Sequence, residues 1–259
     1  MTAPFTGVAV ALVSLFDAGG RLLASATAEH AGALAGRGMR AIVIAGTTGE
    51  AAHLDASDRR ELLAAVRLAV PDSLPVIVGT GDAVAERSLE HTRDAVEGGA
   101  AGVLLYPPGD EASEPFFARV RDVAGRLPVI AYHFPKYFPA VTVQQLGALD
   151  VDGLKDSEGD AERLRQETAS WDQPVYTGFA PLLPVAAGHG ATGAILALAN
   201  LVPELCSRAF AGDADAARDV LAEHEAIGAG GVAAIKRRLA RRSGSPHYVR
   251  GSSPKRVSA

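Results

Sequence analysis

Residues 151–160 read Val-Asp-Gly-Leu-Lys-Asp-Ser-Glu-Gly-Asp, a short apolar run followed at once by residues that commonly begin helices. The apolar part predicts a buried strand, and the acidic and serine residues after it predict a helix start. Lys155 is thus expected at the end of a buried strand. An ammonium group there must be paired or lose its proton easily, and the neutral amine can attack a carbonyl carbon. The simpler interpretation is a lysine that reaches solvent along its alkyl chain.

This unit of a strand and a following helix recurs along the chain. Eight strands are predicted, at 8–13, 41–44, 75–78, 102–105, 128–132, 151–154, 174–177 and 192–195. Helical patterns follow them at about 25–36, 57–70, 84–98, 114–124, 143–149, 161–169 and 182–188, and then at 203–210, 213–227 and 232–242. Strands that are apolar on both faces indicate a parallel sheet covered on both sides, and eight such units close most simply into a barrel.

The fold predicted from this pattern is α/β, a (β/α)8 TIM barrel with a C-terminal helical appendage. An open, doubly wound sheet is disfavoured, because no G-x-G-x-x-G follows the first strand and Gly79-Thr80-Gly81 lacks a third glycine. Without a low-complexity linker, residues 1–259 are predicted to form a single domain, with the barrel in 1–199 and C-terminal helices in 200–259.

Composition excludes several classes of function. The chain has 259 residues, 48% of them hydrophobic, and a net charge of −5, which argues against a nucleic-acid partner. The basic residues at 236–238 and 241–242 are interpreted as a solvated helix face, with an anion site as the less favoured alternative. The single Cys206 is expected to be a buried thiol in a reducing compartment. No signal segment or membrane span is apparent, so a cytoplasmic protein without membrane contact is expected.

In a barrel, chemistry takes place at the carboxyl ends of the strands. Those ends carry Gly46-Thr47-Thr48-Gly49-Glu50, Tyr132, Lys155 and Ile195. The backbone N–H groups and hydroxyls of the first block suit a carboxylate, Tyr132 offers a phenol that can move a proton, and Lys155 offers an amine. Each has a simpler interpretation as a turn, a helix start or a core side chain. Of the four lysines, at 136, 155, 236 and 255, only Lys155 ends a predicted barrel strand.

The seven histidines show neither H-x-H nor H-E-x-x-H spacing, so no metal and no cofactor are expected. His133 follows Tyr132 directly and would point away from the barrel axis on a regular strand. It stays a weaker candidate because this rule loosens at strand ends.

These motifs, in this order and spacing, resemble the dihydrodipicolinate synthase / N-acetylneuraminate lyase superfamily of class I aldolases and lyases. The similarity rests on the block at 46–50, on Tyr132 to Pro135 and on residues 153–157, and it runs from about Gly7 to Pro254. Supporting matches are Gly79-Thr80-Gly81, Leu105-Tyr106-Pro107-Pro108, Tyr176-Thr177-Gly178, and Gly193 through Asn200 to Pro203-Glu204.

The resemblance implies a role for each matching residue. Lys155 would form the Schiff base, Tyr132 would relay protons, and Thr47 would hydrogen-bond that tyrosine. Thr48, Gly46, Gly178 and Ile195 would bind the substrate, with Thr48 and adjacent N–H groups on the pyruvyl carboxylate. The resemblance also implies a homotetramer or a homodimer that takes a 2-oxo acid and an aldehyde as substrates.

The sequence also departs from the family pattern. Tyr137 stands where dihydrodipicolinate synthases carry an arginine for the second carboxylate, and the adjacent Lys136 cannot form the same bidentate contact. The Pro-Pro-Tyr-Tyr stretch, whose tyrosine joins the proton relay across the subunit interface, reads Pro107-Pro108-Gly109-Asp110, and Tyr106 precedes it. Phe179 replaces a usual aspartate, and a final helix is expected to be shortened or absent after Pro254.

Three hypotheses follow. The preferred one is a class I aldolase or lyase that makes or breaks a carbon–carbon bond of pyruvate or a 2-keto-3-deoxy acid through a lysine imine and enamine. The second is 4-hydroxy-tetrahydrodipicolinate synthase, which condenses pyruvate with aspartate semialdehyde and would need Lys136 or another cation. The third is a catalytically weakened paralogue that binds a 2-oxo acid. His133, Lys136, Tyr137 and Tyr106 are further possible site residues.

Overall fold

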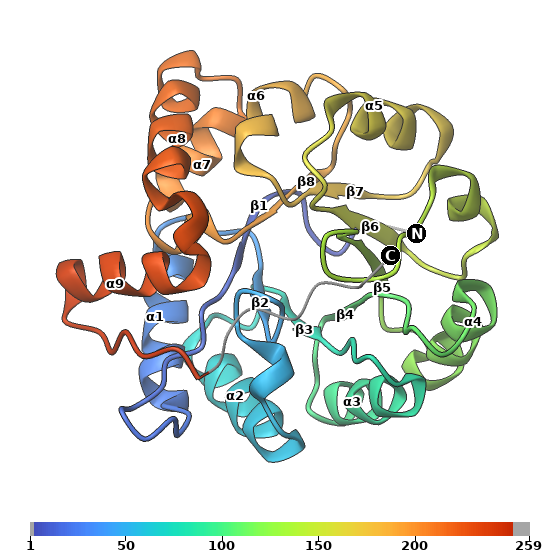
Figure 1. The fold of residues 1–259 in the computed structure, drawn as a ribbon, viewed down its shortest axis with the longest axis horizontal. Helices are drawn as coiled ribbons and strands as arrows, with labels where there is room; N and C mark the ends of the chain where they lie inside the picture. Colours follow the sequence, from blue (N-terminus) through green and yellow to red (C-terminus); the bar gives the residue numbers. More distant parts are fainter. Residues whose placement is uncertain (1–2, 251–259) are drawn as a thin grey trace.

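The computed structural model describes residues 3–250, which form a closed barrel of eight parallel strands ringed by helices (Figure 1). The strands pair in sequence order and the eighth returns to the first, as the sequence predicts. They are β1 (Gly7–Ala11), β2 (Ile42–Ile44), β3 (Val76–Gly79), β4 (Gly102–Leu105), β5 (Val129–His133), β6 (Gly153–Asp156), β7 (Val175–Thr177) and β8 (Gly193–Leu196).

Helices connect the strands and cover their outer faces. The α-helices are α1 (Ala24–Gly36), α2 (Ala56–Ala69), α3 (Ala85–Glu97), α4 (Ser113–Ala124), α5 (Ala161–Ser170), α6 (Leu183–Ala186), α7 (Pro203–Phe210), α8 (Ala214–Ile227) and α9 (Gly231–Ser243). Shorter 3-10 turns are η1 (Ala51–His53), η2 (Val143–Ala148), η3 (Ala180–Leu182), η4 (Leu198–Asn200) and η5 (Gly228–Gly230). Helices α7 and α8 contact α6, α9 contacts α8, and the three together form the predicted appendage (Figure 1).

The barrel interior is filled with side chains, because alternate residues of every strand point inward. These inward residues form one apolar cluster, made of Ala9, Ala11, Ala41, Val43, Ile77, Leu104, Ile130, Tyr132, Tyr176 and Ile195, with Phe5 beneath it. The Phe5 ring stacks on the Tyr176 ring with centroids 4.5 Å apart, and the Tyr176 hydroxyl donates to the Phe5 carbonyl oxygen at 2.9 Å. One end of the barrel is thereby closed, so the site must open at the other end.

Asn200 and Gly79 show how the sequence closes the barrel. The Asn200 side chain accepts from Val13 N at 3.1 Å and donates to Ala11 O at 2.7 Å, which ties the segment after β8 to the end of β1. At Gly79, a side-chain carbon would overlap the Ala45 carbonyl group. Glycine therefore lets the loop after β2 pack directly against β3.

Two elements differ from the sequence prediction. Strand β6 continues to Asp156, so Lys155 lies inside the strand, where it pairs with Tyr132 on β5 and Tyr176 on β7. The helix predicted at 182–188 is instead the turn η3 followed by the single-turn α6, with Pro181 and Pro184 in their first turns. Proline favours a helix start but cannot continue one, because it lacks an N–H donor.

Helix α9 is fixed to the loop after β2 by an ion pair with almost no exposed surface. Lys236 Nζ pairs with the Glu50 carboxylate, donates to Tyr248 O at 2.9 Å, and lies 4.5 Å from the centroid of the Phe16 ring. The second oxygen of Glu50 accepts from Arg250 N at 2.8 Å. The Lys236 side chain is fully buried. The sequence placed Lys236 on a solvated face, and the structure corrects that interpretation.

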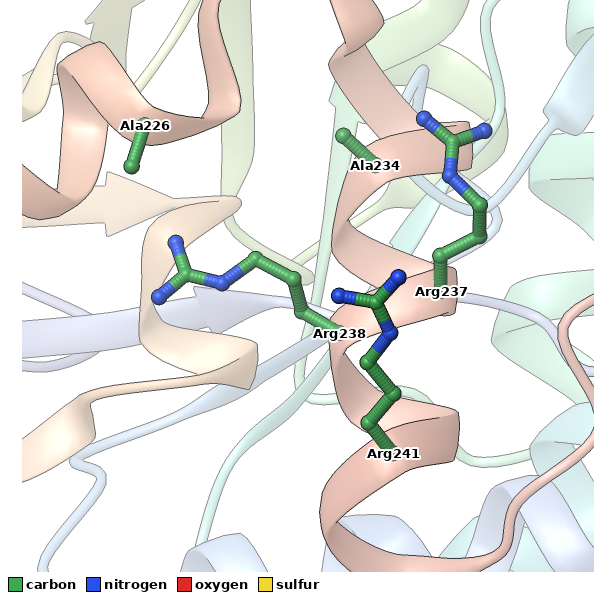
Figure 2. Close-up of a pocket in the computed structure, with 5 residues that line it drawn as sticks. All are labelled: Ala226, Ala234, Arg237, Arg238 and Arg241. Carbon is green, nitrogen blue, oxygen red and sulfur yellow. The ribbon is translucent and has the colours of Figure 1, made fainter.

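The other basic residues of this run do line a surface. A cavity of about 310 Å³ lies between α8 and α9, lined by Ala226, Ala234, Arg237, Arg238 and Arg241 (Figure 2). Arg238 pairs with Glu223 of α8, whereas Arg237 and Arg241 are exposed. This cavity lies on the helical appendage, not in the barrel. Within residues 3–250, no helix is both long and apolar enough to span a membrane. Pro254 and Lys255 lie outside the described residues.

We expect Lys236→Met to lower the free energy of unfolding by about 3–5 kcal/mol, because it removes one partner of a buried ion pair. Urea denaturation of wild type and variant measures the difference. Arg237→Met is the matched control, since it removes an exposed cation one position along the same helix and should change stability by about 0.5 kcal/mol or less. Equal effects of the two substitutions would contradict a stabilising role for the Glu50–Lys236 pair.

Candidate active site

Lys155 and Tyr132 lie side by side at the inner face of the barrel. Strands β5 and β6 pair with Tyr132 directly opposite Lys155, so both side chains point the same way. Lys155 Nζ lies 4.4 Å from the centroid of the Tyr132 ring. The residues are only 6% and 5% exposed, respectively, so both functional groups are largely removed from water.

The buried position changes the proton affinity of Lys155. Burial lowers the pKa of its ammonium group from the ordinary value of 10.5 to about 7. The apolar and aromatic interior around it disfavours the charged form. A substantial fraction of Lys155 is therefore the neutral amine near neutral pH, and this form is a nucleophile.

The Tyr132 phenol is held by two hydroxyl groups. Burial raises the pKa of Tyr132 to about 12, and hydrogen bonds from the side chains of Ser157 and Thr47 act in the opposite direction. Tyr132 therefore stays protonated at neutral pH and can donate its proton. The structure thus brings together Lys155, Tyr132 and Thr47, three residues that the sequence predicted as a group.

The loop after β2 supplies the concave strand end that was predicted to bind a carboxylate. Ala45 and Glu50 adopt positive φ angles of 51° and 57°, so the chain turns sharply on both sides of the loop. Glu50 N donates to Thr47 O at 3.1 Å, which closes the turn. If Gly46 carried a Cβ atom, no heavy atom other than those of its chain neighbours would lie within 4 Å of it, so the space beside this residue is open. Thr48 is 9% exposed, so it lies close beneath the surface of the loop.

Gly178 and Ile195 occupy the other side of the barrel. Gly178 follows β7, and a side-chain carbon there would overlap Ser157 Oγ and lie 3.0 Å from Lys155 Cε. A glycine is therefore required to leave room for the lysine and the serine. Ile195 on β8 is buried within the interior cluster and pairs with Ala9.

The mouth of the barrel above Tyr132 is lined by aromatic rings. Tyr106 stacks on Phe138 with ring centroids 3.6 Å apart, and Phe134 contacts Tyr137 edge to face at 4.8 Å. The centroids of Phe134 and Phe138 lie 6.0 and 5.7 Å from that of Tyr132. Lys136 is exposed, with its Nζ 5.5 Å from the centroid of the Tyr137 ring. The part of the mouth formed by these residues is therefore mostly apolar, with the Lys136 ammonium group at its outer edge.

His133 points to the opposite side of β5 from Tyr132, where it joins a buried network of charges. Its Nε2 lies 2.9 Å from Glu158 Oε2, and its Nδ1 accepts from Val141 N at 3.1 Å. Arg163 lies beside the same cluster, 3.4 Å from Asp156 Oδ2 and 2.8 Å from Glu167 Oε1. Burial raises the pKa of Asp156, and raises that of Glu167 to about 8.

This network also contains a trio of side chains with the chemistry of metal ligands. Ligand atoms of His133, Asp156 and Glu158 lie within 4.8 Å of one another. The Arg163 guanidinium already provides a cation at 3.4 Å from Asp156 and 3.6 Å from Glu158. A metal ion there would be repelled by this arginine, so we interpret the cluster as an ion-pair network behind β6.

Sequence reasoning missed Ser157 as a member of the site. It belongs to the stretch 153–157 that suggested the family, but its contact with Tyr132 depends on the path of the chain after β6. The alternation of side chains along β6 points Lys155 inward and Asp156 outward, and so predicts the next inward position at residue 157. That signal was present in the sequence.

We expect Lys155 to titrate near pH 7. With only four lysines in the chain, selective ¹³Cε labelling gives few NMR signals, and Lys155→Met assigns the one of interest. Because the folded-state pKa lies below the unfolded value, the unfolded chain binds more protons between about pH 7 and 10.5. This residue therefore makes stability rise with pH across that window. A Lys155 midpoint above pH 10 would contradict the buried, unpaired position.

Known proteins resemble this chain along most of its length. The model of the dihydrodipicolinate synthetase family matches residues 4–229. The 4-hydroxy-tetrahydrodipicolinate synthase of Corynebacterium diphtheriae is 32% identical over 232 residues, which cover 85% of this chain and 77% of that protein. The enzyme of the same name from Pseudomonas aeruginosa is 33% identical, with 83% of this chain and 78% of that protein covered.

Solved structures agree with these relationships. A prophage protein of the dihydrodipicolinic acid synthase family from Escherichia coli K12, in complex with pyruvate, superposes with a TM-score of 0.89 at 25% identity, covering 97% of this chain and 94% of that one. The sialic acid aldolase of Ruminococcus gnavus shares the fold, with a TM-score of 0.85 at 22% identity and coverages of 98% and 93%. The chain described here belongs to the dihydrodipicolinate synthetase family.

Proposed function

We propose that this protein is a metal-independent class I aldolase or lyase in which Lys155 forms a Schiff base with pyruvate or a 2-keto-3-deoxy acid. The observation that carries the proposal is the buried Lys155 amine, with a pKa lowered to about 7, against the face of the Tyr132 ring. A neutral amine is needed to attack a ketone, and a nearby phenol is needed to move protons. Binding of pyruvate by the related E. coli prophage protein supports the choice of 2-oxo acid.

The reaction begins when Lys155 Nζ attacks the C2 carbonyl carbon of the 2-oxo acid. A proton moves from the attacking nitrogen to the oxygen to give a neutral carbinolamine. A second proton, from Tyr132, lets the hydroxyl group leave as water, which produces the iminium ion. Loss of a proton from C3 then gives an enamine, whose C3 attacks the carbon of an aldehyde. In the cleavage direction these steps run in reverse.

Tyr132 is the proposed proton carrier in these steps. Its phenol can donate a proton to the departing hydroxyl group, and the resulting phenolate takes the proton lost from C3. The restored phenol then protonates the alkoxide formed when C3 attacks the aldehyde. Water finally adds to the remaining iminium ion and releases the product from Lys155, and the phenolate takes back a proton in that step. Its high pKa, about 12, keeps the proton available at neutral pH. Thr47 holds the phenol, and Thr48 with the N–H groups beside Gly46 would bind the substrate carboxylate.

We expect borohydride reduction in the presence of pyruvate to attach the reduced adduct to Lys155. The mass increase should appear on the peptide that contains Lys155 and vanish in Lys155→Ala, because that variant lacks the amine. Lys136→Ala is the matched control, since it removes an exposed lysine near the same mouth and should keep full labelling. An adduct on Lys136 in the wild-type protein would refute the assignment.

The second substrate enters past the aromatic mouth. Tyr137 stands where an arginine would hold the second carboxylate of aspartate semialdehyde, and the nearby Lys136 is exposed and lies against the Tyr137 ring. An exposed ammonium on a flexible chain gives a weaker and less directional contact than a buried guanidinium. The lining of the mouth favours a neutral aldehyde, whether hydroxylated or apolar.

We expect kcat/KM for aspartate semialdehyde to fall below that for neutral aldehydes. A missing charge-assisted bidentate contact costs about 2–5 kcal/mol, or roughly 30-fold to several thousandfold. Steady-state assays with pyruvate and a panel of aldehydes measure the ratio. Tyr137→Arg should raise the value for aspartate semialdehyde, whereas Tyr137→Phe should not. A wild-type preference for aspartate semialdehyde over every neutral aldehyde would refute this specificity.

The runner-up function is 4-hydroxy-tetrahydrodipicolinate synthase itself. It is favoured by the names of the relatives from C. diphtheriae and P. aeruginosa, at 32% and 33% identity. The same assays decide between the two enzymes. A protein that forms the pyruvate adduct but turns over no aldehyde would instead support the catalytically weakened binding paralogue.

We further propose a homotetramer or homodimer, on the strength of the family resemblance, and a cytoplasmic location. The location is supported by the buried, unpaired thiol of Cys206, the single cysteine of the chain. Light scattering of the purified protein would test the proposed assembly.

A further inference from the structure

The tyrosine that the family resemblance leads us to expect in the proton relay is missing from this chain. After Pro107-Pro108 the chain continues with Gly109 and Asp110, where the family resemblance leads one to expect a relay tyrosine. Gly109 has no side chain, and Asp110 accepts a hydrogen bond from Ala85 N at 3.3 Å. The ring of Tyr106, which precedes the two prolines, is stacked on Phe138 and packed against Gly81.

A different hydroxyl reaches the Tyr132 phenol. Ser157 directly follows β6, and its backbone N–H donates to His133 O at 2.9 Å, which extends the β5–β6 pairing by one residue. Two residues after Lys155 on an extended chain, Ser157 points to the same side as the lysine. Ser157 Oγ and Lys155 Cε both lie close to the place where a Gly178 side chain would start, so the two groups are neighbours.

We infer that Ser157 replaces the absent relay tyrosine, as a positioning residue that holds and polarises the Tyr132 phenol during proton transfer. This inference rests on the proposed Schiff-base function of the same site. The side chains of Ser157 and Thr47 both hydrogen-bond Tyr132, and both lower its pKa relative to burial alone. All three hydroxyl groups come from one chain, so the relay needs no residue from another subunit.

The chemistry assigned to Ser157 leaves the proton balance unchanged. When Tyr132 gives its proton to the substrate oxygen, a phenolate remains, and the Ser157 O–H donates a hydrogen bond to it. When the phenolate takes a proton back, Ser157 returns to its starting role. A hydrogen bond to a charged oxygen is stronger than one to a neutral phenol, so the serine stabilises the step more than the resting state.

Gly178 is part of the same arrangement. Its hydrogen atom leaves the space that Ser157 Oγ occupies, and its N–H donates to Asp156 O at 2.5 Å. The contact fixes the backbone just before the serine. A larger residue at 178 would push the hydroxyl away from its place near Lys155.

The test uses four variants of Ser157 and Tyr132 in the full-length protein. Ser157→Ala should keep the borohydride-trapped pyruvate adduct and KM for pyruvate within about twofold, but lower kcat about tenfold to a hundredfold. Ser157→Thr should restore most of kcat, and Ser157→Val, which has the shape of threonine without the hydroxyl, should not. In a Tyr132→Phe background, Ser157→Ala should have little further effect, because both residues act in one step.

The possible outcomes distinguish failure of this inference from failure of the proposed function. A wild-type protein without a pyruvate adduct refutes both. A wild type that forms the adduct, with Ser157→Ala at full kcat, refutes the inference alone. If Ser157→Thr and Ser157→Val lose turnover equally, or if Ser157→Ala loses the adduct as well, Ser157 is a packing residue and the inference is wrong.

Discussion

The site depends on the removal of water from the amine of Lys155. One face of every barrel strand points into a closed, apolar interior, and β6 places a lysine there. Burial alone lowers the lysine's pKa to about 7. The carboxylate of Asp156, the next residue, points to the outer face and pairs with Arg163. A shift of one residue in the register of β6 would exchange these two side chains. The register of β6 therefore decides whether an amine or a carboxylate faces the interior of the barrel.

The sequence predicted the barrel because the pattern that specifies it is local. Eight apolar runs, each followed by a helical stretch, indicate a parallel barrel without any knowledge of distant contacts. The position of the site follows from the same reasoning, because Lys155, Tyr132 and the threonine pair at 47–48 are all near the carboxyl ends of their strands. Their individual roles stay predictions, since neither the fold nor the family match tests them.

What the sequence could not predict is the pairing of polar side chains across the fold. Lys236 looked like part of an exposed basic run, yet it is buried against Glu50, which lies 186 positions earlier. His133 was expected only to point away from the barrel axis, and the sequence did not predict the charge network that it shares with Glu158. Such contacts depend on the three-dimensional path of several segments, and helical or strand periodicity contains no information about them.

The link between Glu50 and Lys236 also has a consequence for the order in which the protein is completed during synthesis. The loop at residues 46–50 emerges from the ribosome early, together with the first two strands, whereas its buried counter-ion is made 186 residues later. Until then the Glu50 carboxylate lacks that ammonium group. The end of the barrel that carries this loop therefore reaches its final form only after helix α9 has been translated and has packed, although the loop itself belongs to the first fifth of the chain.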